Sequence, residues 1–190
     1  MMSFLLRTLP IVHEWVRNVI APGDCAVDAT VGNGHDTVFL ADLVGEVGHV
    51  IGFDIQEEAV SRTATKLEAA GLLDRVTLHI GCHSEVGSHL SGQIGAAMFN
   101  LGYLPNADKS IITQTETTIA ALEQCLEHLK PQGIITIMCY PGHEGGASEA
   151  LAVDTWARAL ETPNYLVMRM APHNPRNPAP YLLAIQKNFG

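Results

Sequence analysis

The fold is decided by residues 25–37, which read Cys25-Ala26-Val27-Asp28-Ala29-Thr30-Val31-Gly32-Asn33-Gly34-His35-Asp36-Thr37. A short apolar run, two glycines and a helix-forming segment predict a buried strand, a tight turn and a crossover helix. Glycine allows the backbone to turn tightly and to approach a ligand closely, and the first amides of the helix point back toward that ligand. The stretch indicates a nucleotide-binding turn, although two glycines can also serve only as a strand-to-helix connection.

A second apolar run supports the nucleotide interpretation. It reads Gly48-His49-Val50-Ile51-Gly52-Phe53-Asp54 and ends in a carboxylate. An acid at the end of the second strand, about 20 residues beyond the glycine turn, is placed to accept hydrogen bonds from ribose hydroxyls. The two runs together predict an adenosine site.

The acidic residues around the turn distinguish between the possible cofactors. A dinucleotide fingerprint reads G-x-G-x-x-G and offers free amides to a pyrophosphate, whereas here Asp28 and Asp36 flank the turn and would repel one. S-adenosylmethionine carries an ammonium and a sulfonium, which acidic residues favour. We therefore expect S-adenosylmethionine rather than NAD.

Composition sets limits on the class of protein. With 190 residues, of which 47% are hydrophobic, the chain suits one domain over residues 1–190. No apolar run approaches the roughly 20 residues of a membrane helix, and residues 1–10 lack the apolar core of a signal peptide. The four cysteines form no C-x-x-C pair, so we expect neither a metal site nor a disulfide framework, and we expect a cytoplasmic protein.

The order of patterns along the chain is typical of an α/β fold. Helices are expected over residues 10–20, 36–43, 56–70, 115–129 and 147–160, with Gly71 as a C-cap. Strands are expected from Cys25 and over residues 48–54, 75–80, 94–99, 134–139, 165–170 and 181–186, the last two as an antiparallel pair.

Three strings together resemble the Putative rRNA methylase family of class I methyltransferases. They are residues 28–37 (DATVGNGHDT), residues 52–56 (GFDIQ) and residues 99–105 (FNLGYLP). The YtqB-like members of this family (MnmM) methylate the aminomethyl group of 5-aminomethyl-2-thiouridine at the tRNA wobble position. The resemblance implies a Rossmann-like, seven-stranded, mostly parallel sheet with an antiparallel closing strand, helices on both faces and S-adenosylmethionine at the carboxyl ends of the strands. The chain departs from the common pattern at Thr30, where class I enzymes have glycine, and at Asn106-Ala107, where related sequences carry two glycines.

The resemblance also assigns residues to the cofactor. Asp54 is expected at the ribose, the Cys82-His83 turn at adenine, and Asn33, His35 and Asp36 around the methionine moiety. His83 could instead be an exposed turn histidine, and His35 could simply cap its helix. The full set of expected cofactor residues is Asp28, Thr30, Gly32, Asn33, Gly34, His35, Asp36, Thr37, Asp54, Ile55, Gln56, Cys82, His83, Asn100 and Leu101.

The acceptor residues are expected after the fourth strand. Amine-directed methyltransferases place a polar residue and an aromatic beside the acceptor there, which makes Asn100 and Tyr103 the expected catalytic residues. Alternatively, Tyr103 has a purely structural role as an aromatic residue that closes a turn. Gly102, Tyr103, Lys109 and His143 are expected to bind the substrate, His143 from a glycine-rich loop that forms one wall of the pocket.

The expected chemistry is methylation of a neutral primary amine by in-line displacement. Carbon-5 methylation of a pyrimidine would require a nucleophilic cysteine, and Cys139 lies in an apolar run that suggests a core position. A methyltransferase acting on rRNA or on a small metabolite, and a non-catalytic nucleotide-binding module, remain alternatives. The oligomeric state is left open, with a homodimer as one possibility.

The net charge of −9 limits how the chain can hold RNA. Affinity for nucleic acid depends on phosphate neutralisation by Lys and Arg, so a tRNA anticodon loop must be held by a small basic patch. Lys109 is the best-placed candidate, followed by Arg7, Arg17 and Arg176.

Overall fold

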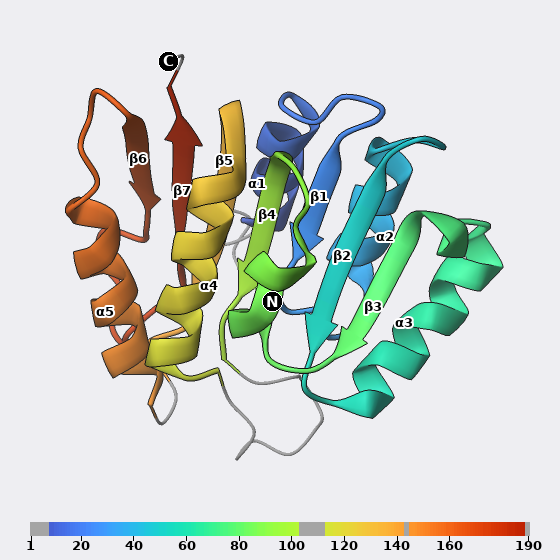
Figure 1. Ribbon diagram of the computed structural model, residues 1–190. Coiled ribbons are helices and arrows are strands. Elements are labelled where there is room, and N and C mark those ends of the chain that lie inside the picture. Colours follow the sequence, from blue (N-terminus) through green and yellow to red (C-terminus); the bar gives the residue numbers. More distant parts are fainter. Residues whose placement is uncertain (1–7, 103–112, 143–144, 189–190) are drawn as a thin grey trace.

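A seven-stranded sheet forms the centre of the protein (Figure 1). The structure is a computed structural model, and it describes residues 8–102, 113–142 and 145–188. The strand order is β3-β2-β1-β4-β5-β7-β6. The strands are β1 (Cys25–Asp28), β2 (His49–Asp54), β3 (Val76–Ile80), β4 (Ile94–Asn100), β5 (Leu129–Cys139), β6 (Tyr165–Met170) and β7 (Tyr181–Lys187).

The first five strands are parallel to one another, and β7 is antiparallel to both of its neighbours, β5 and β6. The predicted mostly parallel sheet and the closing antiparallel pair are therefore confirmed. The strand order reverses between β1 and β4, because β2 and β3 lie on one side of β1 while β4 and β5 lie on the other. In open α/β sheets, ligands bind at the carboxyl ends of the strands beside such a switch point.

Helices cover both faces of the sheet. They are α1 (Leu9–Arg17), α2 (His35–Leu43), α3 (Glu57–Ala70), α4 (Thr115–His128) and α5 (Gly146–Arg158), with 3-10 turns η2 (Leu73–Arg75) and η3 (His83–His89). In Figure 1, α1 and α2 lie behind the sheet and α4 and α5 lie in front. One apolar core joins α1, α2 and α3 to the sheet, and a second joins η3, α4 and α5 to its other face.

The central strands are buried on both faces, which explains their nearly continuous apolar sequences. In β4 every residue from Ile94 to Phe99 is buried, and in β1 only Cys25 retains partial exposure. Each large apolar side chain buried in this way contributes about 1.5–3 kcal/mol. At the carboxyl edge, the apolar runs of β2, β4 and β5 give way to the less buried residues Asp54, Asn100 and Tyr140.

The boundary between α4 and β5 differs from the prediction. A helix to residue 129 and a strand from residue 134 were expected, but β5 already begins at Leu129, which pairs with Ile94. The pairing then skips to Ala96 with Ile134, and Gln132 has a φ of 64° in between. Pro131 therefore lies in an irregular segment within the strand rather than in a connecting loop. A bulge can contain proline because it interrupts the hydrogen-bonded ladder.

Two other local features can be compared with the prediction: η3 differs from it, and Gly71 agrees with it. The short helix η3 was not predicted, since residues 83–89 lack a clear helical period. Gly71 was predicted as a C-cap and has the left-handed φ of 67° that this position favours. In the part of the chain that the structure describes, no helix has the length and apolar character needed to cross a membrane.

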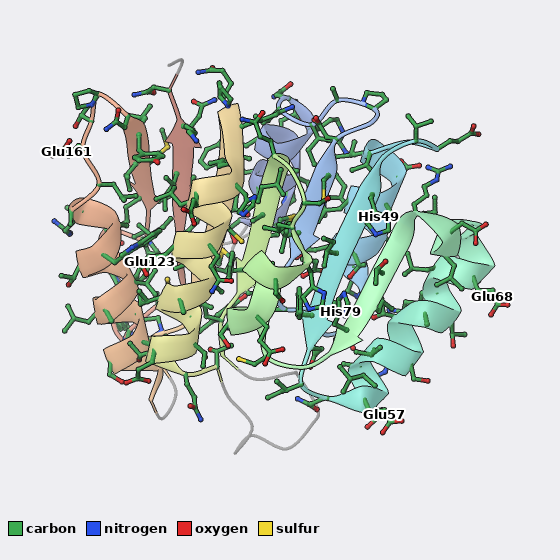
Figure 2. The ribbon with its side chains drawn as sticks, viewed as in Figure 1. His49, Glu57, Glu68, His79, Glu123 and Glu161 are labelled. Carbon is green, nitrogen blue, oxygen red and sulfur yellow. The ribbon has the colours of Figure 1, made fainter. Side chains whose placement is uncertain are left out.

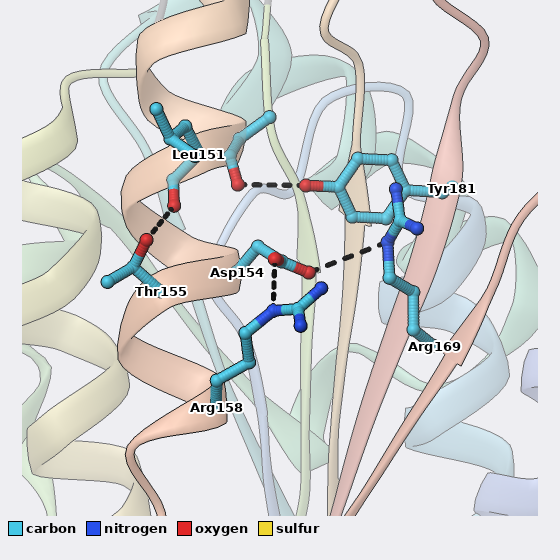
Figure 3. Close-up of polar contacts among 7 residues, drawn as sticks. Leu151, Asp154, Thr155, Arg158, Arg169 and Tyr181 are labelled. Atoms are coloured by element: carbon cyan, nitrogen blue, oxygen red, sulfur yellow. Dashed lines mark hydrogen bonds and ion pairs between the residues drawn. The ribbon is translucent and has the colours of Figure 1, made fainter.

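Exposed acidic residues lie on the outer faces of α3 and α4. Glu57 and Glu68 on α3 and Glu123 on α4 are exposed, and Figure 2 shows them on the outer faces of their helices. Near the β6 edge, Asp154 binds both Arg158 and Arg169, with nitrogen-to-oxygen distances of 2.6 and 3.5 Å (Figure 3). These two arginines are thus partly neutralised by the same carboxylate, so this edge is a poor candidate for a basic patch.

Candidate active site

A cavity of about 850 Å³ opens at the carboxyl edge of the sheet, beside the switch point between β1 and β4. Most of the residues predicted for the cofactor and acceptor line it. These are Thr30, Gly32, Asn33, His35, Asp36, Asp54, Ile55, Gln56, Cys82, His83, Asn100, Leu101 and Gly102. Four segments that are well separated in the sequence, residues 30–36, 54–56, 82–83 and 100–102, thus meet in one site, as the parallel topology requires.

Asp54 ends β2 and holds the glycine turn of β1 in place. Its Oδ2 accepts a hydrogen bond from the Gly32 amide at 2.8 Å, and its Oδ1 accepts one from the Gln56 amide at 2.9 Å. A carboxylate has about four acceptor positions, so two remain for a ligand. Asp54 can therefore accept hydrogen bonds from a vicinal diol such as that of ribose.

The turn after β1 requires glycine at its end. Gly34 has a φ of 75° and precedes the first residue of α2, and a Cβ at this position would lie 2.5 Å from Thr63 Oγ1. Both the left-handed backbone and the close approach of α3 exclude larger residues. The conformation of Gly34 therefore fixes how the first turn of α2 is oriented toward the cavity.

Asn33 is held by two basic residues of α3. Arg62 Nη1 donates to Asn33 Oδ1 at 2.8 Å, and Lys66 Nζ donates to the Asn33 carbonyl at 2.6 Å. Because a guanidinium only donates, the side-chain oxygen must face Arg62. The Asn33 amide NH₂ is consequently the end available to donate to an anionic group in the cavity.

Asn100 is held in the opposite sense. Its Nδ2 donates to Asp36 Oδ2 at 2.6 Å, and its backbone amide donates to Thr30 Oγ1 at 2.7 Å. An ionised carboxylate only accepts, so the NH₂ must face Asp36 and the Asn100 side-chain oxygen is the acceptor left for a ligand. Thr30, which replaces the glycine of the common pattern, thus ties the end of β4 to the end of β1.

Three residues predicted for the cofactor, Asp28, Gly34 and Thr37, do not line the cavity. Asp28 is completely buried and accepts hydrogen bonds from Thr37 Oγ1 at 2.6 Å and from the Thr30 amide at 3.2 Å. Burial, followed by the nearby charge of Asp36, raises its pKa to about 7. Of the two acids expected to repel a pyrophosphate, only Asp36 therefore faces the cavity.

His83 is buried, which argues against the alternative of an exposed turn histidine. Its Nδ1 lies 3.1 Å from the Ala29 carbonyl, which can only accept, so Nδ1 carries the proton. Burial lowers the pKa of His83, so the ring is neutral and Nε2 is an acceptor. Nε2 is buried without a hydrogen-bond partner among the described residues, and such an orphaned acceptor suits a donor that arrives with a ligand.

Several cavity residues were not predicted. The segment before and at the start of α1 contributes Thr8 and Leu9, and the chain around the start of α4 contributes Thr113, Gln114 and Thr117. No local pattern marks these residues, because they reach the cavity only through the tertiary fold. Phe53, Gly81, Met138, Pro178 and Pro180 also line it.

The loop after β5 forms part of the wall, as predicted. Tyr140 and Gly142 line the cavity, and Tyr140 is 38% exposed. Burial of the hydroxyl and the nearby charge of Asp36 raise the Tyr140 pKa, so the phenol stays neutral. Tyr103, Lys109 and His143, which were predicted for the substrate, lie outside the described residues.

A buried carboxylate supports the cavity wall at the end of β4. Glu149 on α5 accepts hydrogen bonds from Thr113 Oγ1 at 2.7 Å and Thr118 Oγ1 at 2.8 Å. Thr113 Oγ1 in turn accepts from the Gly102 amide at 2.9 Å. This chain joins the end of β4 to α4 and α5, so the position of Gly102 depends on both helices.

The structure bears on two other chemistries. Cys139 is completely buried, and burial raises its thiol pKa to about 12, so it is not a candidate nucleophile. Within residues 8–102, 113–142 and 145–188, no cluster of three or more His, Cys, Asp or Glu side chains could hold a metal ion.

Comparison with solved structures identifies the fold as that of class I methyltransferases. A putative rRNA methylase from Clostridium thermocellum is 41% identical, with a TM-score of 0.92, over 98% of this chain and 99% of that chain. A putative methyltransferase from Streptococcus mutans, solved in complex with SAH, is 37% identical, with a TM-score of 0.87, over 98% of this chain and 99% of that one. The predicted Rossmann-like methyltransferase fold is thereby confirmed.

Comparison with characterised sequences and family models gives the same result. The tRNA (mnm(5)s(2)U34)-methyltransferase, chloroplastic, of Arabidopsis thaliana is 36% identical over 95% of this chain and 69% of its own length. The model of the Protein-L-isoaspartate(D-aspartate) O-methyltransferase family matches residues 6–89, and that of the family described as Putative rRNA methylase matches residues 50–186. The chain belongs to the Putative rRNA methylase family of methyltransferases.

Proposed function

We propose that this protein transfers a methyl group from S-adenosylmethionine to the aminomethyl nitrogen of 5-aminomethyl-2-thiouridine at the wobble position of tRNA. The observation that carries the proposal is the orientation of Asn100, whose side-chain oxygen is left as an acceptor in the cavity while its NH₂ binds Asp36. An amine nucleophile needs a hydrogen-bond acceptor to orient it. The name of the Arabidopsis relative, which is 36% identical, supports the same substrate.

The residues of the cavity fit S-adenosylmethionine. Asp54 offers two acceptor positions to the ribose hydroxyls, and the Asn33 amide NH₂ offers a donor to the methionine carboxylate. His83 Nε2 is an orphaned acceptor in the wall beside Cys82, where the adenine amino group would supply a donor. The SAH complex of the Streptococcus mutans relative supports this choice of cofactor.

The proposed reaction needs a neutral amine next to an activated methyl group. When bound, S-adenosylmethionine supplies that methyl on its sulfonium, so that the N–C bond forms as the S–C bond breaks and the proton of the amine passes to solvent. Asn100 orients the amine, and the apolar parts of Met138 and Leu101 exclude water from the same side of the cavity. Tyr140, which is 38% exposed in the cavity wall, would stack on the pyrimidine ring in this proposal.

The other substrate residues stay predictions. Tyr103 and Lys109 follow Gly102 in sequence, and His143 follows Gly142; both glycines line the cavity. Support for a role in substrate binding is therefore their closeness in sequence to the acceptor side. A homodimer and a cytoplasmic location are likewise predictions, which size-exclusion chromatography and localisation in cells would test.

The test is mass spectrometry of tRNA nucleosides. Purified protein is incubated with isotopically methyl-labelled S-adenosylmethionine and tRNA that carries 5-aminomethyl-2-thiouridine, and the expected result is labelled 5-methylaminomethyl-2-thiouridine. The reaction without protein is the blank, and loss of the label in Asn100→Ala would support the assigned acceptor site. Label in rRNA or in a small amine instead would favour the corresponding alternative, and cofactor binding without transfer to any of these would favour a non-catalytic module.

A further inference from the structure

Asp36, which orients Asn100, is itself held by a histidine from another helix. His13 Nε2 on α1 lies 2.7 Å from Asp36 Oδ1, and Asn100 Nδ2 lies 2.6 Å from Asp36 Oδ2. Both oxygens of this nearly buried carboxylate are therefore occupied from opposite sides. His13 does not line the cavity, so any effect it has on a bound substrate passes through Asp36.

The His13 ring is fixed in position by packing. It stacks on Phe39 of α2, with ring centroids 3.7 Å apart and an angle of 5° between the planes. The guanidinium of Arg17, one helical turn later on α1, also lies over the Phe39 ring, at 5.4 Å from its centroid. Because the carboxylate of Asp36 can only accept, the His13 nitrogen that faces it must carry a proton.

The charges around Asp36 are predominantly negative. Asp28 on β1 is close enough for the charge of Asp36 to raise its pKa, and Tyr140 after β5 is affected in the same direction. The other titratable groups that line the cavity are Asp54 on β2, His35 on α2 and Cys82 and His83 at η3. The nearby cations are engaged elsewhere, since Arg62 and Lys66 on α3 bind Asn33 and Arg17 on α1 is paired with Glu14. Such a surrounding favours the protonated form of an amine held nearby.

We propose that His13 is a positioning residue for methyl transfer: its hydrogen bond to Asp36 orients Asn100 and makes that carboxylate a weaker acceptor for the amine, so that the acceptor amine is bound in its neutral form. This inference rests on the proposed function, because it requires an amine as acceptor. Without the proton from His13, the carboxylate would rotate away from Asn100 or stabilise an ammonium. An ammonium has no lone pair and cannot attack the methyl group.

The effect of His13 should depend on pH. At a pH above the apparent pKa of the bound amine, the substrate is neutral with or without His13, and only the contribution to orientation is lost. At lower pH, removal of the donor also converts part of the amine to ammonium. The acid limb of the pH-rate profile should therefore shift to higher pH when the donor is removed.

The experiment compares three variants in single-turnover methylation of tRNA that carries 5-aminomethyl-2-thiouridine. His13→Phe keeps an aromatic ring against Phe39 but removes the donor, and His13→Gln keeps a neutral donor. His49→Phe is the matched control, because His49 begins β2 at the opposite edge of the sheet and binds Thr77 at 2.9 Å (Figure 2). Circular dichroism and the affinity for S-adenosylmethionine check that each variant is folded and binds cofactor.

His13→Phe should lower the transfer rate at neutral pH by about ten-fold or more, the scale of a lost hydrogen bond to a charged group. The deficit should narrow as pH rises, and His13→Gln should recover most of the rate. If His13→Phe does not fold, His13→Met carries the same prediction. A wild-type rate and pH profile in His13→Phe would overturn the proposal, as would an equal, pH-independent loss in the Phe and Gln variants. Failure of the wild-type protein to methylate this tRNA would instead overturn the proposed function.

Discussion

Because Asp28 is buried, its ionisation destabilises the native state, and the free energy of unfolding should therefore depend on pH. It is completely buried at the end of β1, and burial together with the charge of Asp36 raises its pKa from an ordinary value of 3.8 to about 7. Between these two values the native state binds a proton that the unfolded chain has lost. The stabilising contribution of this proton is fully present below about pH 4 and is lost as the pH rises through about 7.

The size of the effect follows from the two pKa values. Since one pH unit corresponds to about 1.4 kcal/mol, the difference between 3.8 and about 7 is worth about 4 kcal/mol of unfolding free energy. Asp28→Asn places a permanently neutral group of the same shape at this position. Its oxygen can accept from the Thr30 amide, and its NH₂ can donate to the Thr37 hydroxyl after that hydroxyl rotates.

Urea denaturation, followed by the fluorescence of Trp15 and Trp156, measures the free energy of unfolding at pH 5 and pH 9. Asp28→Asn should be more stable than the wild-type protein by about 2 kcal/mol at pH 5 and by about 4 kcal/mol at pH 9, because pH 5 already lies about one pH unit above the unfolded-state pKa. Asp74→Asn is the control for the change in net charge, because Asp74 is exposed, and its difference should not vary with pH. A difference for Asp28→Asn that is constant between pH 5 and pH 9 would refute the reasoning. The affinity of this variant for S-adenosylmethionine also tests the prediction that Asp28 contributes to cofactor binding.

Three further outcomes are expected. Asp54→Ala should weaken binding of S-adenosylmethionine by about 10- to 100-fold, because it removes a charged acceptor and leaves the Gly32 and Gln56 amides without partners. An unchanged affinity in calorimetry would show that Asp54 is not part of the cofactor site. Asn100→Ala should bind the cofactor normally but lose about 100-fold or more in methyl transfer, and near wild-type turnover would place the acceptor elsewhere. The log–log dependence of tRNA affinity on salt should have a shallow slope of about −2 to −4, which Lys109→Ala makes shallower by about one phosphate contact. A steep slope in the wild-type protein would show a basic surface larger than this sequence contains.

The sheet and its carboxyl edge could be predicted from sequence because both depend on local patterns. Buried parallel strands are apolar along their whole length, and β4 and residues 134–139 of β5 have this character. Once the strands are known to be parallel, Asp54 and Asn100 must come to the same edge, whatever their separation in sequence. This reasoning located most of the cavity lining.

The contacts that orient these residues could not be predicted. Asn100 binds Asp36 across 64 positions of sequence, and Arg62 binds Asn33 across 29. Periodicity describes neighbours within about four residues of a helix, so Arg62 and Lys66 resemble an ordinary solvated helix face. His13 gives no signal for the same reason. The sequence placed Asp28 at the end of β1. It could not show whether the carboxylate points into the cavity or under the turn, because that depends on which face of the pleated strand the side chain of Asp28 takes.

Under the proposed function, the two asparagines of the cavity would bind an anionic group and a basic group side by side. Arg62 donates to the Asn33 side-chain oxygen, so the Asn33 NH₂ is presented to the ligand, whereas Asp36 accepts from the Asn100 NH₂, so the Asn100 oxygen is presented. A free asparagine can rotate and serve either group equally well, and it discriminates only when a charged neighbour fixes its orientation. Selectivity for a cofactor carboxylate at one end and an amine at the other therefore depends on charged residues that do not themselves need to touch either ligand. On this argument the charge pattern of α1, α2 and α3 determines which acceptor the cavity methylates.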